Sequence, residues 1–348
     1  MEEPNDTRHI TFQVPEAFAH RFAFKQGQYV TLMAELEGTE VRRSYSICAA
    51  VDEPLSVAVK RIEGGVFSGY LHDVLKVGDT VAALPPEGAF TSELDPSQAR
   101  SYLLMAAGSG ITPILSIAKT VLAVEPDSRV TLIYGNRSSN QIIFGEALLW
   151  LKNRFMDRLQ WINVFSQERQ EAPILNGRID NRKGLELGRH LVELTGFDAY
   201  FLCGPQGMVS EMSRMLRLAG VEQEKIHIEL FFASAADARM AIEKQQTRVR
   251  RYAGLNTQVQ VRFSGREVVF ELTADGESIL DSAVSAGLEL PFSCKGGVCA
   301  TCKAQVIEGR VDMDLNHALS PDEVAEGYIL TCQAHPITDR VAIDFDVL

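Results

Sequence analysis

Four of the six cysteines in this 348-residue chain lie close together near its C-terminal end. Three of them follow the spacing Cys294-x4-Cys299-x2-Cys302, and Cys332 comes from a separate segment. In a chain of this length, clustered cysteines indicate metal or redox ligands more readily than disulfides. Any fold of this region must therefore bring one short loop against a distant segment, so that four thiols converge.

The cysteine spacing is typical of a plant-type 2Fe–2S centre. Gly296, Gly297 and Ala300 permit the sharp turns and the close backbone approach that such a loop needs. A tetrahedral zinc site is the main alternative, since four cysteines also bind zinc. Zinc ribbons usually carry two CxxC pairs and this chain has one, so the sequence predicts an iron–sulfur cluster on the four cysteines.

The first 98 residues consist of short runs of alternating apolar and polar residues, separated by glycine and proline. This pattern favours a small antiparallel barrel, because alternation gives each strand one inward face and the turn residues reverse the chain. We expect strands at about 10–14, 28–35, 43–49, 55–60 and 80–84. A helix is expected at about 67–75, where four apolar residues share one face.

The pattern changes over residues 99–237. A continuous apolar run at 102–107 indicates a strand buried on both faces, and a helix with a 3.6-residue apolar period follows it. Further strands are expected at 130–134, 159–165, 200–203 and 226–231. Strands that alternate with helices predict a parallel α/β sheet.

Residues 238–256 contain five basic residues and one acidic residue, with few large apolar ones, and predict a linker. Beyond it, alternation around Ser264-Gly265 predicts a hairpin, and a helix is expected at about 278–286. Ser320 and Glu323 form a capping box that predicts a short helix before the last cysteine. The predicted domains are therefore a barrel at 1–98, an α/β domain at 99–237, a linker at 238–256 and a cysteine-bearing domain at 257–348.

Charge narrows the possible functions. The net charge is −12, and residues 257–348 hold 6 basic against 15 acidic residues. Such a chain is a poor match for nucleic acid, which needs a basic surface. The acidic last quarter is either an ordinary soluble surface or a means of steering toward a basic partner. Without a long apolar run or a signal pattern, the chain is expected to be cytoplasmic, with no membrane partner.

Three short motifs could bind phosphates or a flavin. Gly108-Ser109-Gly110-Ile111-Thr112-Pro113 joins a buried strand to a helix, where free N–H groups suit a pyrophosphate, although any α/β domain can have such a tight turn. Arg43-Ser44-Tyr45-Ser46 offers a cation, a ring and a hydroxyl to a flavin, or is an ordinary strand. Gly64-Gly65-Val66-Phe67-Ser68 enters a helix and is a second candidate phosphate cradle.

The order of these motifs, followed by Cys203-Gly204-Pro205, resembles the ferredoxin–NADP reductase superfamily. With the cysteine motif at the C-terminal end, the chain resembles the reductase components of multicomponent oxygenases over nearly its full length. The segments that are similar to the reductase subunits of phenylacetyl-CoA epoxygenases are 43–48, 59–61, 64–68, 107–113, 134–137, 202–205 and 294–299. The resemblance implies a multidomain α+β and α/β protein with an antiparallel flavin-binding β-barrel, a parallel-sheet nucleotide-binding domain and a C-terminal β-grasp 2Fe–2S ferredoxin domain.

The resemblance also implies roles for individual residues. FAD is expected to be held by Arg43, Tyr45, Ser46, Lys60, Gly65 and Ser68, with Phe231 near the flavin or simply in the core. The nicotinamide nucleotide is expected to meet Gly108, Gly110, Thr112, Pro113, Arg137, Ser166, Cys203 and Gly204. Ser46 and Cys203 would lie near the hydride transfer, although Cys203 on its own is typical of a buried thiol at a strand end. The family normally has a strand before the one at Ile10, and this chain is expected to lack it.

NADPH is preferred over NADH on two grounds. No acidic residue closely follows the strand at 130–134 to hold a ribose 2′-hydroxyl, and Arg137 and Arg178 are candidate contacts for a 2′-phosphate. The family's arginine is missing, because Gln167 follows Ser166. Both candidate arginines could equally be ordinary surface residues.

The resulting hypothesis is an NAD(P)H-dependent reductase that sends electrons through FAD and the cluster to a partner oxygenase. A reductase for a different acceptor, such as a ring-hydroxylating dioxygenase, a demethylase or a hybrid-cluster protein, is the main alternative. A non-enzymatic 2Fe–2S carrier or sensor is a second one, and a zinc-stabilised module is a third.

Overall fold

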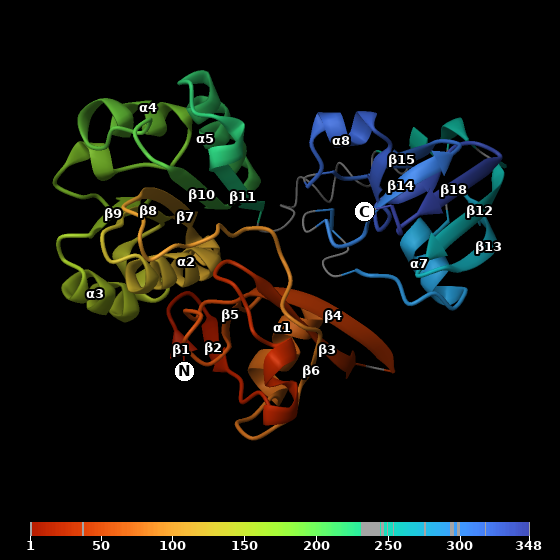
Figure 1. The fold of residues 1–348 in the computed structure, drawn as a ribbon, viewed down its shortest axis with the longest axis horizontal. Coiled ribbons are helices and arrows are strands. Elements are labelled where there is room, and N and C mark those ends of the chain that lie inside the picture. Colours follow the sequence, from red (N-terminus) through yellow and green to blue (C-terminus); the bar gives the residue numbers. More distant parts are fainter. Residues whose placement is uncertain are drawn as a thin grey trace. The chain divides into compact units, whose positions relative to one another are not determined.

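The computed structural model describes residues 2–36, 38–230, 244, 247–248, 250–252, 254–274, 276–292, 296–297, 300–316 and 318–347. The chain divides into two compact units, Met1–Phe231 and Phe232–Leu348 (Figure 1). Within the described part of the chain, no helix is long and apolar enough to cross a membrane.

Two three-stranded antiparallel sheets form the first part of the first unit. One has the order β1-β2-β5 and the other β4-β3-β6. Their strands are β1 (Glu2–Glu3), β2 (Thr7–Thr11), β3 (Tyr29–Leu36), β4 (Thr39–Ser46), β5 (Ser56–Lys60) and β6 (Ala82–Ala83). Bridges at Ile47↔Val57 and Tyr29↔Glu87 extend the pairing. The inward residues of both sheets pack into one apolar core, as their alternation predicts.

Short helical segments accompany this barrel. The 3₁₀ helix η1 covers Glu16–Arg21, and α1 (Val66–Gly69) continues into the π-helical turn η2 (Tyr70–Val74), which together fill the helix predicted at 67–75. The expectation that no strand precedes the one at Ile10 is wrong. The two-residue strand β1 pairs with β2 through Glu2↔Arg8 and Glu3↔Thr7, which a run of two residues is too short to reveal by alternation.

A five-stranded parallel sheet of order β11-β10-β7-β8-β9 follows, as the alternating pattern predicts. Its elements are β7 (Ser101–Ala107), α2 (Ile111–Val124), β8 (Arg129–Asn136), α3 (Gly145–Arg154), β9 (Leu159–Phe165), α4 (Asn181–His190), β10 (Ala199–Gly204), α5 (Gln206–Leu218) and β11 (Ile226–Leu230). The 3₁₀ turns η3 (Gly108–Gly110), η4 (Ser139–Gln141), η5 (Pro173–Leu175) and η6 (Gln223–Lys225) lie in its connections. Helices α2 and α3 cover one face of the sheet, and α4 and α5 cover the other (Figure 1).

The barrel and the parallel sheet share a core. Cys48, Ala58 and Phe90 of the barrel belong to the apolar cluster beneath α2, and the ring of Phe90 meets Phe201 of β10 edge-on at 5.3 Å. The Ser116 hydroxyl of α2 donates a buried hydrogen bond of 2.6 Å to the Ala49 carbonyl. This packing joins the two halves into one body, so residues of the barrel and of the sheet can form a common site.

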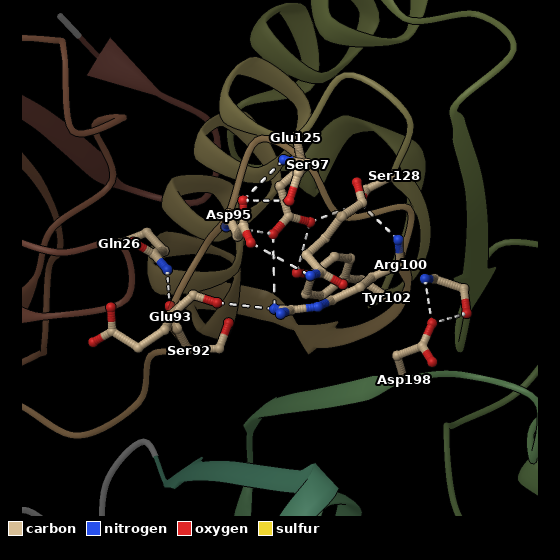
Figure 2. Close-up of polar contacts among 12 residues, drawn as sticks. Gln26, Ser92, Glu93, Asp95, Ser97, Arg100, Tyr102, Glu125, Ser128 and Asp198 are labelled. Atoms are coloured by element: carbon tan, nitrogen blue, oxygen red, sulfur yellow. Dashed lines mark hydrogen bonds and ion pairs between the residues drawn. The ribbon is translucent and has the colours of Figure 1, made fainter.

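A buried carboxylate holds the connector between the two halves. Glu125, at the end of α2, has no exposed surface and accepts hydrogen bonds from the Tyr102 hydroxyl (2.9 Å), the Ser128 hydroxyl (2.6 Å) and the Asp95 N–H (3.1 Å) (Figure 2). Burial raises the pKa of Tyr102 to about 12, so its hydroxyl stays a donor. Arg100 lies 3.7 Å from Glu125 and also donates to the Glu93 carbonyl. The connector is therefore held by the Glu125 carboxylate, whose two oxygens both accept hydrogen bonds.

The second unit has the strand order β13-β12-β18-β14-β16, with β12 and β18 parallel and the other pairs antiparallel. Its elements are β12 (Asn256–Phe263), β13 (Arg266–Thr273), α7 (Ile279–Ser285), β14 (Lys303–Glu308), β15 (Val311–Met313), α8 (Pro321–Ala325), β16 (Tyr328–Leu330), β17 (Ala334–Pro336) and β18 (Arg340–Asp344). The hairpin around Ser264-Gly265 and the capping box of Ser320 and Glu323 are confirmed. Strands β15 and β17 pair with each other in a separate two-stranded sheet.

Candidate electron-transfer sites

The glycine-rich turn after β7 packs against the end of β10. A Cβ atom on Gly110 would lie 2.3 Å from the Cys203 carbonyl oxygen, which no side chain could tolerate. Gly108 has φ +54°, and its carbonyl accepts a hydrogen bond of 2.9 Å from the Tyr134 hydroxyl. Thr112 is buried and donates to the Ser109 carbonyl at 3.0 Å. The turn therefore offers bare backbone at the carboxyl edge of the sheet, where a dinucleotide binds in folds of this kind.

A residue of the barrel meets two residues of the parallel sheet at this edge. The Ser46 hydroxyl, at the end of β4, donates a hydrogen bond of 2.7 Å to Glu229 of β11. Glu229 stands beside Cys203 in the register of β11 and β10. Cys203 is fully buried, and burial, followed by the Glu229 charge, raises its thiol pKa well above the usual value. Cys203 therefore stays a neutral thiol, in line with the predicted buried strand-end position.

Three other predicted flavin residues lie on strands β4 and β5 of the barrel. Arg43 is exposed and Tyr45 is half-buried on β4, and the Tyr45 ring stacks on Phe67 with centroids 6.2 Å apart. Burial raises the pKa of Tyr45, so its hydroxyl is neutral. Lys60 is exposed at the end of β5, and burial of part of its side chain, together with nearby Arg137, lowers its pKa. A half-buried ring and two exposed cations suit a flavin with its phosphates.

Gly65 and Ser68 form the second candidate cradle. The Ser68 hydroxyl accepts from the Ile62 N–H and donates to the Gly65 carbonyl, both at 3.2 Å. A Cβ atom on Gly65 would lie 2.6 Å from the Ser68 oxygen, so a larger residue there would displace the Ser68 hydroxyl. Ser68 therefore shapes the loop, and its role toward FAD stays a prediction.

Arg137 and Ser166 lie side by side at the carboxyl ends of β8 and β9. The Ser166 N–H donates to the carbonyl of Asn136, next to Arg137, at 3.0 Å. A shallow pocket of about 340 Å³ opens there. It is lined by Phe165, Ser166, Gln167, Glu168, Arg169, Asn176 and Gly177. Hydrogen bonds from the Ser139 N–H and hydroxyl lower the pKa of Glu168, so the pocket holds an anion beside its cation Arg169.

Two of the predicted iron ligands are described, and the fold brings them together. Cys302 and Cys332 are both buried in the apolar core of the second unit. The Thr331 N–H and hydroxyl both donate to the Cys302 carbonyl, at 3.1 and 3.0 Å, and so join the two ligand segments. Gly297 has φ +74°, and a Cβ atom there would lie 2.9 Å from the Leu315 carbonyl oxygen. The described residues therefore fit a cluster held by one tight glycine loop and a second segment.

Three predicted site residues lie outside the described part of the chain, namely Phe231, Cys294 and Cys299. Glu229 is the residue that the sequence reasoning missed, together with Glu168 and Arg169 of the pocket. No local motif marks Glu229, because its partner Ser46 is 183 residues away. Its position at the end of a predicted strand, adjacent to the strand of Cys203, was the only available signal.

Three family models match the chain in the order of its domains. The oxidoreductase FAD-binding domain matches residues 2–92, and the oxidoreductase NAD-binding domain matches residues 104–214. The 2Fe–2S iron–sulfur cluster binding domain matches residues 261–336. The chain therefore carries FAD-binding, NAD-binding and 2Fe–2S domains.

Relatives share this whole arrangement. One subunit of the 1,2-phenylacetyl-CoA epoxidase of Escherichia coli (strain K12) is 43% identical over 345 residues, which cover 99% of this chain and 95% of that protein. The ferredoxin reductase component of the 3-ketosteroid-9-alpha-monooxygenase of Rhodococcus rhodochrous is 32% identical over 359 residues, covering 99% and 94%. The chain belongs to this family of oxygenase reductase components. As a member, the reductase is an oxidoreductase enzyme.

Solved structures agree on the fold of the reductase. Phthalate dioxygenase reductase matches with a TM-score of 0.58 and 23% identity, over 99% of this chain and 95% of that one. An intact type IV self-sufficient cytochrome P450 monooxygenase matches with a TM-score of 0.63 and 21% identity, over 99% of this chain and 40% of that one. The predicted fold class, with its barrel, parallel sheet and C-terminal ferredoxin domain, is thereby confirmed.

Proposed function

We propose that this reductase passes electrons from NADPH through FAD and the 2Fe–2S cluster to an oxygenase of the phenylacetyl-CoA epoxidase type. The observation that carries the proposal is the hydrogen bond of 2.7 Å from Ser46 to Glu229, beside the buried Cys203. It joins the flavin-binding barrel to the nucleotide-binding sheet at the edge where both predicted ligands would meet. The proposed domains remain 1–98, 99–237 and 257–348, with 238–256 between the last two.

When bound, FAD supplies the conversion between the two electrons of a hydride and the single electrons that an iron–sulfur cluster accepts. The residues of this chain would position and insulate that exchange. Ser46 holds the Glu229 side chain across the junction, and the neutral Cys203 leaves no competing thiolate there. Gly110 lets the η3 turn approach β10 closely, so the nucleotide would meet bare backbone at the carboxyl edge of the sheet. No side chain needs to transfer a proton for the hydride step.

The choice of NADPH rests on Arg137 as a candidate cation for the 2′-phosphate, and the hydrogen bond of 2.8 Å from the Gln167 N–H to the Arg137 backbone carbonyl keeps it close to Ser166. Arg169 in the pocket is a further cation for a 2′-phosphate, and Arg178 stays a candidate. Glu168 acts in the opposite direction, because a carboxylate favours a free ribose hydroxyl. Steady-state reduction of cytochrome c with NADPH and with NADH compares the two, and a clear preference for NADH overturns this part of the proposal.

The proposed partner follows from the relatives. The 43% identical Escherichia coli protein belongs to a phenylacetyl-CoA epoxidase, whereas more distant ones serve other monooxygenases. The test combines the purified reductase with the other epoxidase components and phenylacetyl-CoA and measures NADPH-dependent product. We expect turnover there and little with a ring-hydroxylating dioxygenase. The reverse preference would assign the reductase to a different oxygenase.

The absorption spectrum of the purified protein tests the electron path itself. The proposal expects flavin bands together with iron–sulfur bands and iron in the metal analysis. Iron–sulfur bands without flavin bands would indicate a non-enzymatic carrier or sensor. Zinc without iron would indicate a zinc-stabilised structural module. Either result would defeat the proposed function.

A further inference from the structure

The basic segment that precedes the ferredoxin domain contains a buried arginine. Arg248 is only 2% exposed and is the largest of the fully buried side chains in the described residues. Its Nε donates to the Ala274 carbonyl at 2.8 Å, and its two terminal nitrogens face the two carboxylate oxygens of Asp314. Burying a guanidinium without such partners is strongly unfavourable, because the charge loses its hydration. Part of the predicted linker is therefore docked on the second unit by one charged side chain.

Asp314 connects this arginine to a third group. The His335 Nε2 lies 3.2 Å from Oδ2 of Asp314, and His335 is itself buried. Burial alone would raise the pKa of Asp314, but the hydrogen bonds from His335 and Arg248 outweigh it and hold the pKa below the usual value. Asp314 is therefore an anion between two nitrogen donors, and of these Arg248 carries the permanent positive charge.

Asp314 also supports the segments that carry the predicted iron ligands. Its N–H donates to the Gln333 carbonyl at 2.9 Å, and Gln333 follows Cys332. The next residue, Leu315, has the carbonyl oxygen that packs against Gly297 of the ligand loop. The stretch of Asp314 and Leu315 thus contacts both the ligand loop and the fourth-ligand segment, and Arg248 binds this stretch through the Asp314 carboxylate.

We propose that Arg248 is a positioning residue for the 2Fe–2S cluster, acting through Asp314. Arg248 fixes the segment before the ferredoxin domain to the second unit, and its positive charge offsets the negative charge of Asp314. The inference depends on the proposed function only for the statement that the cluster receives electrons from the upstream domains. Reduction adds an electron to the cluster. A nearby uncompensated negative charge therefore disfavours the reduced form, and a nearby uncompensated positive charge favours it.

The main test is the midpoint potential of the cluster in the full-length holoprotein, measured by an EPR-monitored titration with dithionite and mediators. We expect Arg248→Met to lower the potential, because Asp314 is left unbalanced. Asp314→Asn is expected to raise it, because Arg248 then carries a net positive charge. The double variant should return toward the wild-type value. Arg248→Lys keeps the charge without the fork and should lie between wild type and Arg248→Met.

The matched control is Arg250→Met, which removes an exposed arginine of the same segment and should leave the potential unchanged. Shifts of equal sign in Arg248→Met and Asp314→Asn, or no shift in either, would overturn the inference. Because dithionite replaces NADPH, the result is independent of the proposed electron path.

Hydrogen exchange gives a second measurement that needs no redox activity. The Tyr252 N–H donates to the Arg248 carbonyl at 2.9 Å. Peptides covering 247–252 should therefore be protected in wild type and in Arg250→Met, and should exchange at least tenfold faster in Arg248→Met. Equal exchange in the three proteins would show that Arg248 does not dock the segment. If Arg248→Met loses its iron, hydrogen exchange is measured on Arg248→Lys instead. The inference then requires that protection in Arg248→Lys is lower than in wild type but not absent.

Discussion

At the scale of single residues, the Ser46–Glu229 hydrogen bond joins two domains at their proposed reaction site. We expect Ser46→Ala to slow flavin reduction by NADPH roughly 10- to 100-fold, because a hydrogen bond to a charged group contributes about 1.5–3 kcal/mol. Stopped-flow absorbance of the flavin band measures this rate directly. Because Ser46 is also a predicted FAD contact, the flavin content of the variant is measured separately and the rates are compared at equal bound flavin.

Ser44→Ala is the control for this prediction. Ser44 is two residues away on the same strand, and its hydroxyl lies 3.0 Å from Thr31 within the barrel. Its removal should change the rate less than about threefold, within the range of a surface hydrogen bond. If Ser46→Ala and Ser44→Ala slow flavin reduction equally, the Ser46–Glu229 hydrogen bond has no particular role in the reaction.

His227 offers a residue-scale test by pH. Its ring stacks on Phe201 with centroids 4.5 Å apart, and burial lowers its pKa below the ordinary 6.5. The folded state therefore favours the neutral ring. The stabilisation is fully present above pH 6.5 and is lost as the pH falls through the lower folded pKa. We expect His227→Phe to lose less thermal stability than wild type between pH 7.5 and about 5, by calorimetry.

The comparison for His227 is His190→Gln, an exposed histidine at the end of α4, which should follow the wild-type curve. An unchanged acid sensitivity in His227→Phe would mean that other groups cause the acid loss.

At the scale of elements, the close approach of the η3 turn to β10 depends on one missing side chain. Gly110→Ala would place a methyl group 2.3 Å from the Cys203 carbonyl oxygen, so the turn or the strand must move. We expect a lower melting temperature and loss of NADPH-dependent flavin reduction, with the iron–sulfur absorbance retained. Gly207→Ala in α5 has open space around its Cβ and should be neutral or stabilising by about 1 kcal/mol. Equal behaviour of the two variants would contradict the argument.

The elements themselves were largely predictable from the sequence. Alternation and the 3.6-residue period are local signals, and they correctly predict β7, α2, β8, β9, β10 and the hairpin of β12 and β13. The pairing of Glu229 with Ser46 was not predictable, because tertiary packing across 183 residues creates it. Arg248 presents the same difficulty, since a basic segment is expected to be solvated until its burial against Asp314 is known.

At the scale of the whole molecule, the relative placement of the barrel and the parallel sheet rests partly on Glu125. In Glu125→Gln the side-chain NH2 group replaces one of the oxygens that accept from Tyr102, Ser128 and Asp95, so a donor faces a donor. The electrostatic attraction to Arg100 is also lost. We expect the free energy of unfolding to fall by about 1–3 kcal/mol in urea titrations. Glu93→Gln removes only an exposed ion pair with Lys25 and should cost less than about 1 kcal/mol. A comparable loss in both would refute the role of the buried network.

The uneven charge gives the last prediction, which concerns the delivery of electrons. Residues 257–348 hold 6 basic and 15 acidic residues, and we expect this acidic surface to attract basic acceptors. Salt weakens such attraction, because it shortens the electrostatic screening length to about 10 Å at 0.1 M. Cytochrome c is a basic acceptor, and its NADPH-dependent reduction should fall roughly tenfold between 20 and 300 mM NaCl. Ferricyanide is an anion, and its reduction at the same protein concentration should stay level or rise. If both acceptors respond alike, salt acts on an internal step, and the acidic surface does not steer the acceptor.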